Sequence, residues 1–180
     1  VEVDAETGRF IDFGDDVLDE RLSAGWDVGV ILLGNNYRED QNEFRLRLEE
    51  MVQRLSPQPV VLLTVTEFTP SRLEVNQVIF DLAGLYDNVL IVDWGATTAA
   101  DDALTGGDGL HLTDKGRVAL AEQVALALGQ SPQPAGECLD SQFDDDSSGP
   151  VDGTSTTTTV RKRPTTTQPA ATTTSRSSAS

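Results

Sequence analysis

The stretch VVLLTV, residues 60–65, decides the fold of this 180-residue chain. A continuous run of branched apolar residues, without alternating polar positions, is typical of a strand buried on both faces of a parallel sheet. Two similar runs lie on either side of it in the sequence, WDVGVILLG at 26–34 and NVLIVDW at 88–94. The opening segment VEVDA, residues 1–5, is typical of the end of a further strand.

Apolar residues recur at helical spacing between these runs, at 14–23, 39–55 and 71–85. A last helix is expected to begin after the capping residue Thr113 and to end at Gly129. Strands and helices therefore alternate, with crossovers long enough for parallel pairing. The sequence predicts a three-layer α/β/α domain of the flavodoxin-like kind, with helices on both faces of the sheet.

The composition of the chain changes after residue 130. Residues 1–130 are predicted to form the α/β domain, and residues 131–180 an acidic linker followed by a tail rich in Thr, Ser and Pro. The tail has too few large apolar side chains to offset the entropy of ordering, so we predict that it is disordered. Such a composition is also typical of extracellular stalks. The single cysteine, Cys138, rules out an internal disulfide framework.

The formal net charge of −17 excludes some partners. An acidic surface of this kind repels nucleic-acid phosphates and anionic lipid, so we predict no nucleic-acid partner. No apolar run approaches the roughly 18 residues of a membrane helix. Asp101 and Asp102 are interpreted as solvated loop residues rather than metal ligands. No metal and no organic cofactor is therefore expected.

Four polar or flexible positions are expected to meet at one edge of the sheet. Ligands bind beyond the carboxyl ends of the strands in an open parallel sheet. Gly8 follows the first apolar segment, Asn36 follows the second, and a loop after residue 94 leads to Asp108 and His111. A glycine N–H and an asparagine amide can stabilise an oxyanion. His111 could transfer protons, and Asp108 could orient its ring.

Several of these positions resemble the sequence blocks of SGNH (GDSL-type) hydrolases. Gly34-Asn35-Asn36 is similar to their Gly-x-Asn block, and Asp108-Gly109-Leu110-His111 to their closing Asp-x-x-His block. The resemblance covers roughly residues 1–129 and is strongest with SGNH domains at the C-terminus of membrane acyltransferases that modify surface polysaccharides. Further similar segments are Val3-Asp4-Ala5, Gly8-Arg9, Asn76 and Val92-Asp93-Trp94.

This resemblance implies an ester-cleaving site that works through an acyl-serine intermediate. Gly8 and Asn36 would form the oxyanion hole, and Asp108 and His111 would be the last two members of the triad. The substrate implied is an acylated carbohydrate or a small ester, and the activity that of an esterase or O-acyltransferase.

The family's nucleophile stands in a Gly-Asp-Ser turn, and this sequence contains no Gly-Asp-Ser. Ser71, which follows Pro70, is the best substitute among the serines of the domain. We expect that the chain is the C-terminal part of a longer protein. It would then lack the first strand and the nucleophile, and would be inactive on its own.

Two other interpretations stay open. The domain could be a non-catalytic SGNH-like module that binds a carbohydrate or a partner, or the pair Asp108 and His111 could be only a helix-start turn. The sequence upstream of Val1 discriminates the enzyme from the binding module. The tail and the resemblance favour an extracytoplasmic location, with membrane attachment only through helices upstream of Val1.

Overall fold

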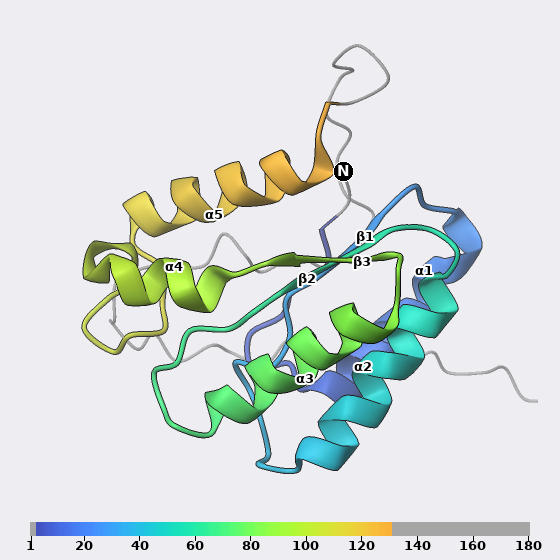
Figure 1. Ribbon diagram of the computed structural model, residues 1–180, viewed down its shortest axis with the longest axis horizontal. Helices are drawn as coiled ribbons and strands as arrows, with labels where there is room; N and C mark the ends of the chain where they lie inside the picture. The colour runs from blue at the N-terminus through green and yellow to red at the C-terminus, as the bar shows by residue number, and fades with distance from the viewer. Residues whose placement is uncertain (1–2, 131–180) are drawn as a thin grey trace, which may run out of the picture.

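The computed structural model describes residues 3–130, in which three parallel strands lie between helices (Figure 1). The strands are β1 (Gly29–Ile31), β2 (Val60–Leu63) and β3 (Val89–Val92), in the order β1-β2-β3. Val60 is in register with Gly29 on one side and with Val89 on the other. This arrangement confirms the predicted α/β class with a parallel sheet.

Helices cover both faces of the sheet. On one face lie α1 (Ile11–Arg21), α2 (Gln41–Leu55) and α3 (Arg72–Leu85), as Figure 1 shows. The other face is crossed by α5 (Asp114–Leu128), and α4 (Trp94–Ala100) follows directly from the end of β3. Short 3₁₀ turns, η1 (Leu22–Ala24) and η2 (Asp102–Leu104), complete the secondary structure.

The last helix begins and ends at the residues that the sequence predicts. The side chain of Thr113 accepts a hydrogen bond from the N–H of Gly116 at 3.1 Å, which satisfies one of the free donors of the first turn. At the other end, Gly129 adopts a φ of 73°, a left-handed conformation that glycine tolerates best. The cap of α5 at Thr113 therefore lies two residues after His111.

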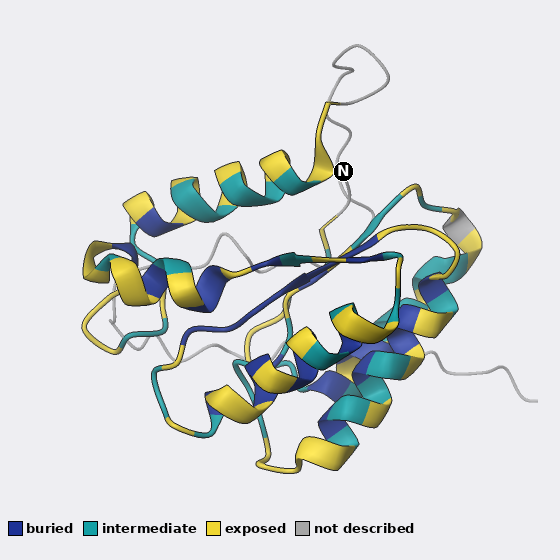
Figure 2. Cartoon of the chain, viewed as in Figure 1, coloured by how far each residue is buried: buried dark blue, intermediate teal, exposed yellow. Residues whose placement is uncertain are grey.

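The hydrophobic core is concentrated around β2. Val60 and Leu62 point toward α2 and α3, while Val61 and Leu63 point toward α5, and all four are at most 2% exposed. Figure 2 shows the same asymmetry, with dark-blue inner faces on α2 and α3 and an α5 that is mostly intermediate or exposed. The prediction of a strand buried on both faces is confirmed for β2.

β1 differs from β2 because it lies at the edge of the sheet. The N–H of Gly29 donates to the carbonyl of Pro59 at 3.0 Å, so the N–H of Val30 points to the opposite side. No strand pairs with that side within residues 3–130. The side chains of Val30 and Leu32 are 44% and 36% exposed, so the predicted burial of this run on both faces is wrong here.

Three predicted boundaries also differ from the structure. In the opening segment, Ala5 forms only an isolated bridge, and Val3 and Asp4 belong to no strand. The first helix begins at Ile11 rather than at residue 14. The segment expected to be a loop before Asp108 contains α4 and η2.

The helix α4 begins where it does because Asp93 caps it. The carboxylate of Asp93 accepts hydrogen bonds from the N–H of Ala96 at 3.1 Å and from the hydroxyl of Thr64 at 2.8 Å. Its sequence, WGATTAA, contains glycine and threonines, which are weak helix formers, and its seven residues show little periodicity.

The predicted linker and tail, residues 131–180 with Cys138, lie outside the described residues. Among the helices that the structure describes, none is long and apolar enough to cross a membrane.

Candidate active site

The segment between η2 and α5, residues 105–113, forms a closed turn. Thr105 and Leu112 form an antiparallel bridge, and the N–H of Gly106 donates to the carbonyl of His111 at 2.7 Å. The N–H of Gly109 donates to the carbonyl of Gly106 at 2.9 Å, and its φ of 70° is one that other residues rarely adopt. Backbone hydrogen bonds therefore fix the path of the chain on both sides of His111.

The structure brings Asp108 and His111 into direct contact. The Oδ2 atom of Asp108 lies 2.6 Å from the Nδ1 atom of His111. Its Oδ1 atom accepts hydrogen bonds from the backbone N–H groups of Leu110 at 2.9 Å and His111 at 3.0 Å. With Nδ1 donating to the carboxylate, the Nε2 atom of a neutral ring is an acceptor. The side chain of His111 is 72% exposed, so Nε2 is accessible.

These contacts also determine the ionisation of Asp108. The hydrogen bond from His111, followed by those from the two backbone N–H groups, lowers the pKa of Asp108 from 3.8 to about 2. The carboxylate is therefore ionised throughout the neutral range, as a residue that orients an imidazole and stabilises its protonated form must be.

Asn36 contacts the turn that contains Gly8, through the residue that follows this glycine. Residues 6–9 form a turn in which the N–H of Arg9 donates to the carbonyl of Glu6 at 3.3 Å, and Gly8 has a φ of 80°. The side-chain amide of Asn36 donates to the carbonyl of Arg9 at 3.2 Å. An asparagine NH₂ group has two donors, so one of them remains for a ligand.

Ion pairs hold the turn that contains Gly8. Asp4 pairs with Arg9 at 2.8 Å and with Arg21 of α1 at 2.7 Å. Burial raises the pKa of Asp4, but the hydrogen bonds from Arg21 and Arg9 and their charges outweigh it, so the pKa lies below its usual value. The Asp4 carboxylate thus remains charged and ties the turn to α1.

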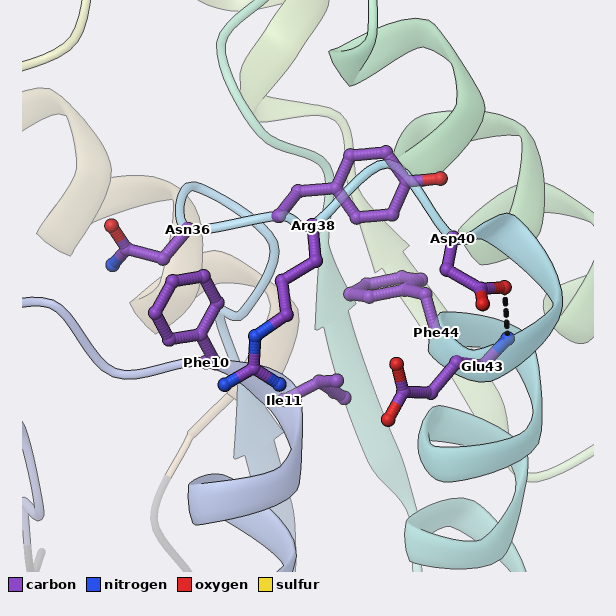
Figure 3. A pocket seen from close by; sticks show the side chains of 8 residues that line it. Phe10, Ile11, Asn36, Arg38, Asp40, Glu43 and Phe44 are labelled. Carbon is purple, nitrogen blue, oxygen red and sulfur yellow. Dashed lines mark hydrogen bonds between the residues drawn. The ribbon is translucent and has the colours of Figure 1, made fainter.

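A small hollow lies beside Asn36 (Figure 3). Its volume of about 10 Å³ has room for roughly one water molecule, which is too little for a substrate. Figure 3 shows Asn36 at its rim, with the amide pointing away from Phe44 and Glu43. The Cζ atom of Arg38 lies 4.2 Å from the centroid of the Phe10 ring, and the two side chains bound the hollow on this side. A wider depression is lined by Asp40 and residues of α2 and contains none of the predicted site residues.

The structure therefore places the predicted site residues in two pairs. Asp108 contacts His111, and Asn36 contacts the turn that contains Gly8. Within residues 3–130, no hydrogen bond or ion pair joins Asp108 or His111 to Gly8 or Asn36. Asn36 follows β1, and the Asp108–His111 turn follows β3 through α4, so both pairs come after the carboxyl ends of strands. That the two pairs act on one substrate stays a prediction.

None of the described serines forms a hydrogen bond with the side chain of His111. The Oγ atom of Ser71 lies 3.2 Å from the hydroxyl of Thr69 and accepts a hydrogen bond from Arg72 at 3.0 Å. Ser56 ends α2, and Ser23 lies in η1. We find no serine within residues 3–130 that is placed as a nucleophile next to the imidazole.

Asn76, which the resemblance singles out without a role, has a structural one. It is 5% exposed, and its Oδ1 atom accepts a hydrogen bond from the N–H of Val65 at 2.8 Å. Its Nδ2 atom donates to the carbonyl of Val65 at 3.0 Å and to Glu67 at 3.1 Å. Asn76 thus makes the hydrogen bonds that a neighbouring strand would otherwise make with the backbone of Val65, just after β2. These bonds fix the path of the chain where it leaves β2.

The fold is thus a parallel sheet between helices, with an Asp–His pair in the turn that follows β3, α4 and η2. The crystal structure of the lipase/acylhydrolase from Enterococcus faecalis is similar, with a TM-score of 0.59 and 21% sequence identity. The similarity covers 65% of this chain and 69% of that chain. No family model matches the sequence, and no curated protein matches it. At this identity the likeness shows the fold, in agreement with the resemblance to SGNH hydrolases.

Proposed function

We propose that this chain supplies the acid–base pair and the oxyanion donors of an SGNH-type serine esterase. The observation that carries the proposal is the 2.6 Å contact between Asp108 and His111, which leaves the accessible Nε2 atom as a proton acceptor. The fold supports it, as does the contact of the Asn36 amide with the turn that contains Gly8. The nucleophile in this proposal is a serine from a segment outside the sequence given.

The proposed mechanism has two half-reactions, in each of which His111 first removes a proton and then returns it. His111 Nε2 takes the serine proton while the serine oxygen attacks the ester carbonyl, and Gly8 N–H and Asn36 Nδ2 donate to the oxyanion. The C–O bond to the alcohol then breaks, and His111 returns the proton to the leaving oxygen. Water or a carbohydrate hydroxyl next attacks the acyl-serine, with His111 again removing and returning the proton. Asp108 stays ionised throughout.

The open edge of β1 supports the position of the nucleophile segment. A further parallel strand on this edge would pair the N–H of Val30 and cover its exposed side chain. Such a strand would end near the turn of Asn36, at the same edge of the sheet. We propose that it carries the serine at its carboxyl end.

The finer assignments rest on the resemblance and on the composition of the tail. We propose an acylated carbohydrate or a small ester as the substrate, O-acyl transfer as an activity beside hydrolysis, and an extracytoplasmic location. The balance between transfer and hydrolysis would depend on how well the acyl-enzyme is shielded from water.

The test is an ester-hydrolysis assay on the full-length gene product that contains residues 1–180. With p-nitrophenyl acetate as the substrate, we expect activity that His111→Ala lowers by roughly 10³-fold or more. Asp102→Asn is the matched control, because Asp102 is an exposed acid of η2 outside the Asp108–His111 turn. Hydrolysis that survives His111→Ala would contradict the proposal.

The exposed imidazole and the lack of a described serine partner also fit the second candidate, a non-catalytic binding module. A full-length product without esterase activity, which binds O-acetylated polysaccharide and loses that binding with His111→Ala, would favour this module over the enzyme.

A further inference from the structure

Arg72 is a buried cation that forms no salt bridge within the described residues. It begins α3 and is 9% exposed. Its Nη2 atom donates to the carbonyl of Asn35 at 2.6 Å and its Nη1 atom to the hydroxyl of Ser71 at 3.0 Å, while its Nε atom has no partner. Within residues 3–130 it forms no salt bridge, and burial lowers the pKa of Arg72 although the charge of Glu39 acts in the opposite direction. Burying a charge without a salt bridge costs free energy, which makes the contacts of this residue of interest.

The contacts of Arg72 reach both halves of the candidate site. On one side, the guanidinium holds the carbonyl of Asn35, the neighbour of Asn36. On the other side, it lies over the ring of Phe68 at 4.6 Å. Phe68 in turn backs Gly109, since a Cβ placed on Gly109 would lie only 3.3 Å from the Cβ of Phe68.

The bond to Asn35 has a direct effect on the oxyanion donor. The carbonyl of Asn35 and the N–H of Asn36 belong to one planar peptide group and point in opposite directions. Holding that carbonyl therefore fixes the orientation of the Asn36 backbone, from which the side-chain amide projects. A charged donor on the carbonyl also gives a stronger hydrogen bond than a neutral one.

We propose that Arg72 is a positioning residue that fixes the place of the Asn36 side-chain amide relative to the imidazole of His111. It acts through Asn35 on one side and through Phe68 on the other. This inference rests on the proposed esterase function. Arg72 does not touch the reacting atoms in this mechanism, and its substitution changes the geometry of the oxyanion donor relative to the imidazole.

The first test measures turnover of the full-length product with Arg72→Met, a change that keeps the apolar volume and removes the charge. We expect kcat to fall about 10²-fold, as on losing an oxyanion donor, with KM changed less than about threefold. Arg72→Lys keeps one charged donor and should recover part of that loss. Arg45→Met is the matched control, because Arg45 pairs with Asp81 between α2 and α3. An unchanged kcat in Arg72→Met would overturn the inference and leave the proposed function standing.

The second test does not depend on activity. In NMR spectra of ¹⁵N-labelled protein, the amide signals of both Asn36 and His111 should shift when Arg72 is replaced by Met. Neither signal should shift in Arg45→Met. Shifts at Asn36 alone would overturn the coupling between the two halves. If the amides of both residues move but wild-type protein hydrolyses no ester, the proposed function fails and the link through Arg72 stands as a property of the fold.

Discussion

At the scale of single residues, Asp108 performs two tasks with its two oxygens. Oδ1 holds the backbone of the turn, and Oδ2 holds the imidazole of His111. The lowered pKa of Asp108 means that the ionised carboxylate stabilises the folded turn above about pH 3.8. That stabilisation is lost as the pH falls through about 2. The side chain is 52% exposed, so solvent screens the effect.

The carboxyl group of Asp108 should therefore titrate near pH 2, which ¹³C NMR of the side chain can follow. In His111→Ala the midpoint should rise, because the largest cause of the shift is removed. It should stay below 3.8, because the hydrogen bonds from the two backbone N–H groups remain. A midpoint at the ordinary value in the unsubstituted chain would contradict the hydrogen-bonded turn.

Replacing Asn36 tests the second half of the site. Asn36→Ala removes an oxyanion donor, so kcat of the full-length product should fall by about 10²–10³ with little change in KM. Asn42→Ala is the matched control, since Asn42 is exposed in the first turn of α2. Steady-state kinetics on p-nitrophenyl acetate give both constants, and equal kcat values for the two variants would exclude a catalytic role for Asn36.

At the scale of elements, the contact between η2 and α5 supports the histidine turn. A Cβ on Gly116 would lie 1.9 Å from the carbonyl oxygen of Leu104, and that same carbonyl accepts a hydrogen bond from the N–H of Thr113 at 3.1 Å. Only glycine lets the first turn of α5 approach so closely. The close approach anchors both ends of the turn that holds His111.

Gly116→Ala should therefore destabilise the chain by about 1–3 kcal/mol, because backbone atoms must move apart. Gly84→Ala is the control, as Gly84 lies in α3 with nothing within 4 Å of an added Cβ. That control should be neutral or more stable by about 0.5 kcal/mol, since alanine is the better helix former. Urea unfolding followed by circular dichroism compares the two, and equal stabilities would contradict the packing of α5 on η2.

The sequence predicts a helix or strand well where buried apolar residues recur along it at a regular spacing. Continuous apolar runs predict β2 and β3, and helical stripes predict α2 and α3, within one or two residues of their ends. α4 escapes prediction because it is short and lacks periodicity, and because Thr64, which accepts a hydrogen bond from the N–H of Gly95 in its first turn, is distant in sequence.

The same reason explains what could be predicted of the site. The contact between Asp108 and His111 is local, so their spacing predicts it, and the structure confirms the contact. Nothing in the sequence pattern indicates that Arg72 is buried, or that it reaches both Asn35 and Phe68. Such contacts depend on how separate elements pack.

At the scale of the whole molecule, the open edge of β1 predicts an uneven stability. Within the described residues, β2 is paired on both sides, whereas β1 is paired only with β2. In hydrogen exchange of this chain, the amide of Val30 should exchange much faster than that of Gly29, which donates to Pro59.

The full-length product should protect the amide of Val30 if the proposed nucleophile strand pairs with it. Exchange measured by NMR on both proteins makes the comparison, with Val61 of β2 as an internal control. Equal protection of Val30 and Gly29 in the 180-residue chain would contradict the open edge. A sharp two-state melt of this chain at an ordinary temperature would argue against the proposed further strand.

The unpaired edge of β1 also has a consequence for the association of this chain with a second copy of itself. At neutral pH we expect the charge of −17 to keep two copies apart, so that their β1 edges do not meet. Near the isoelectric point of about 4.1 this repulsion disappears, while the backbone groups of the edge remain unpaired. Light scattering should then detect self-association of the 180-residue chain, and Val30→Lys should suppress it. On this view, the acidic surface acts against association through the β1 edge at neutral pH.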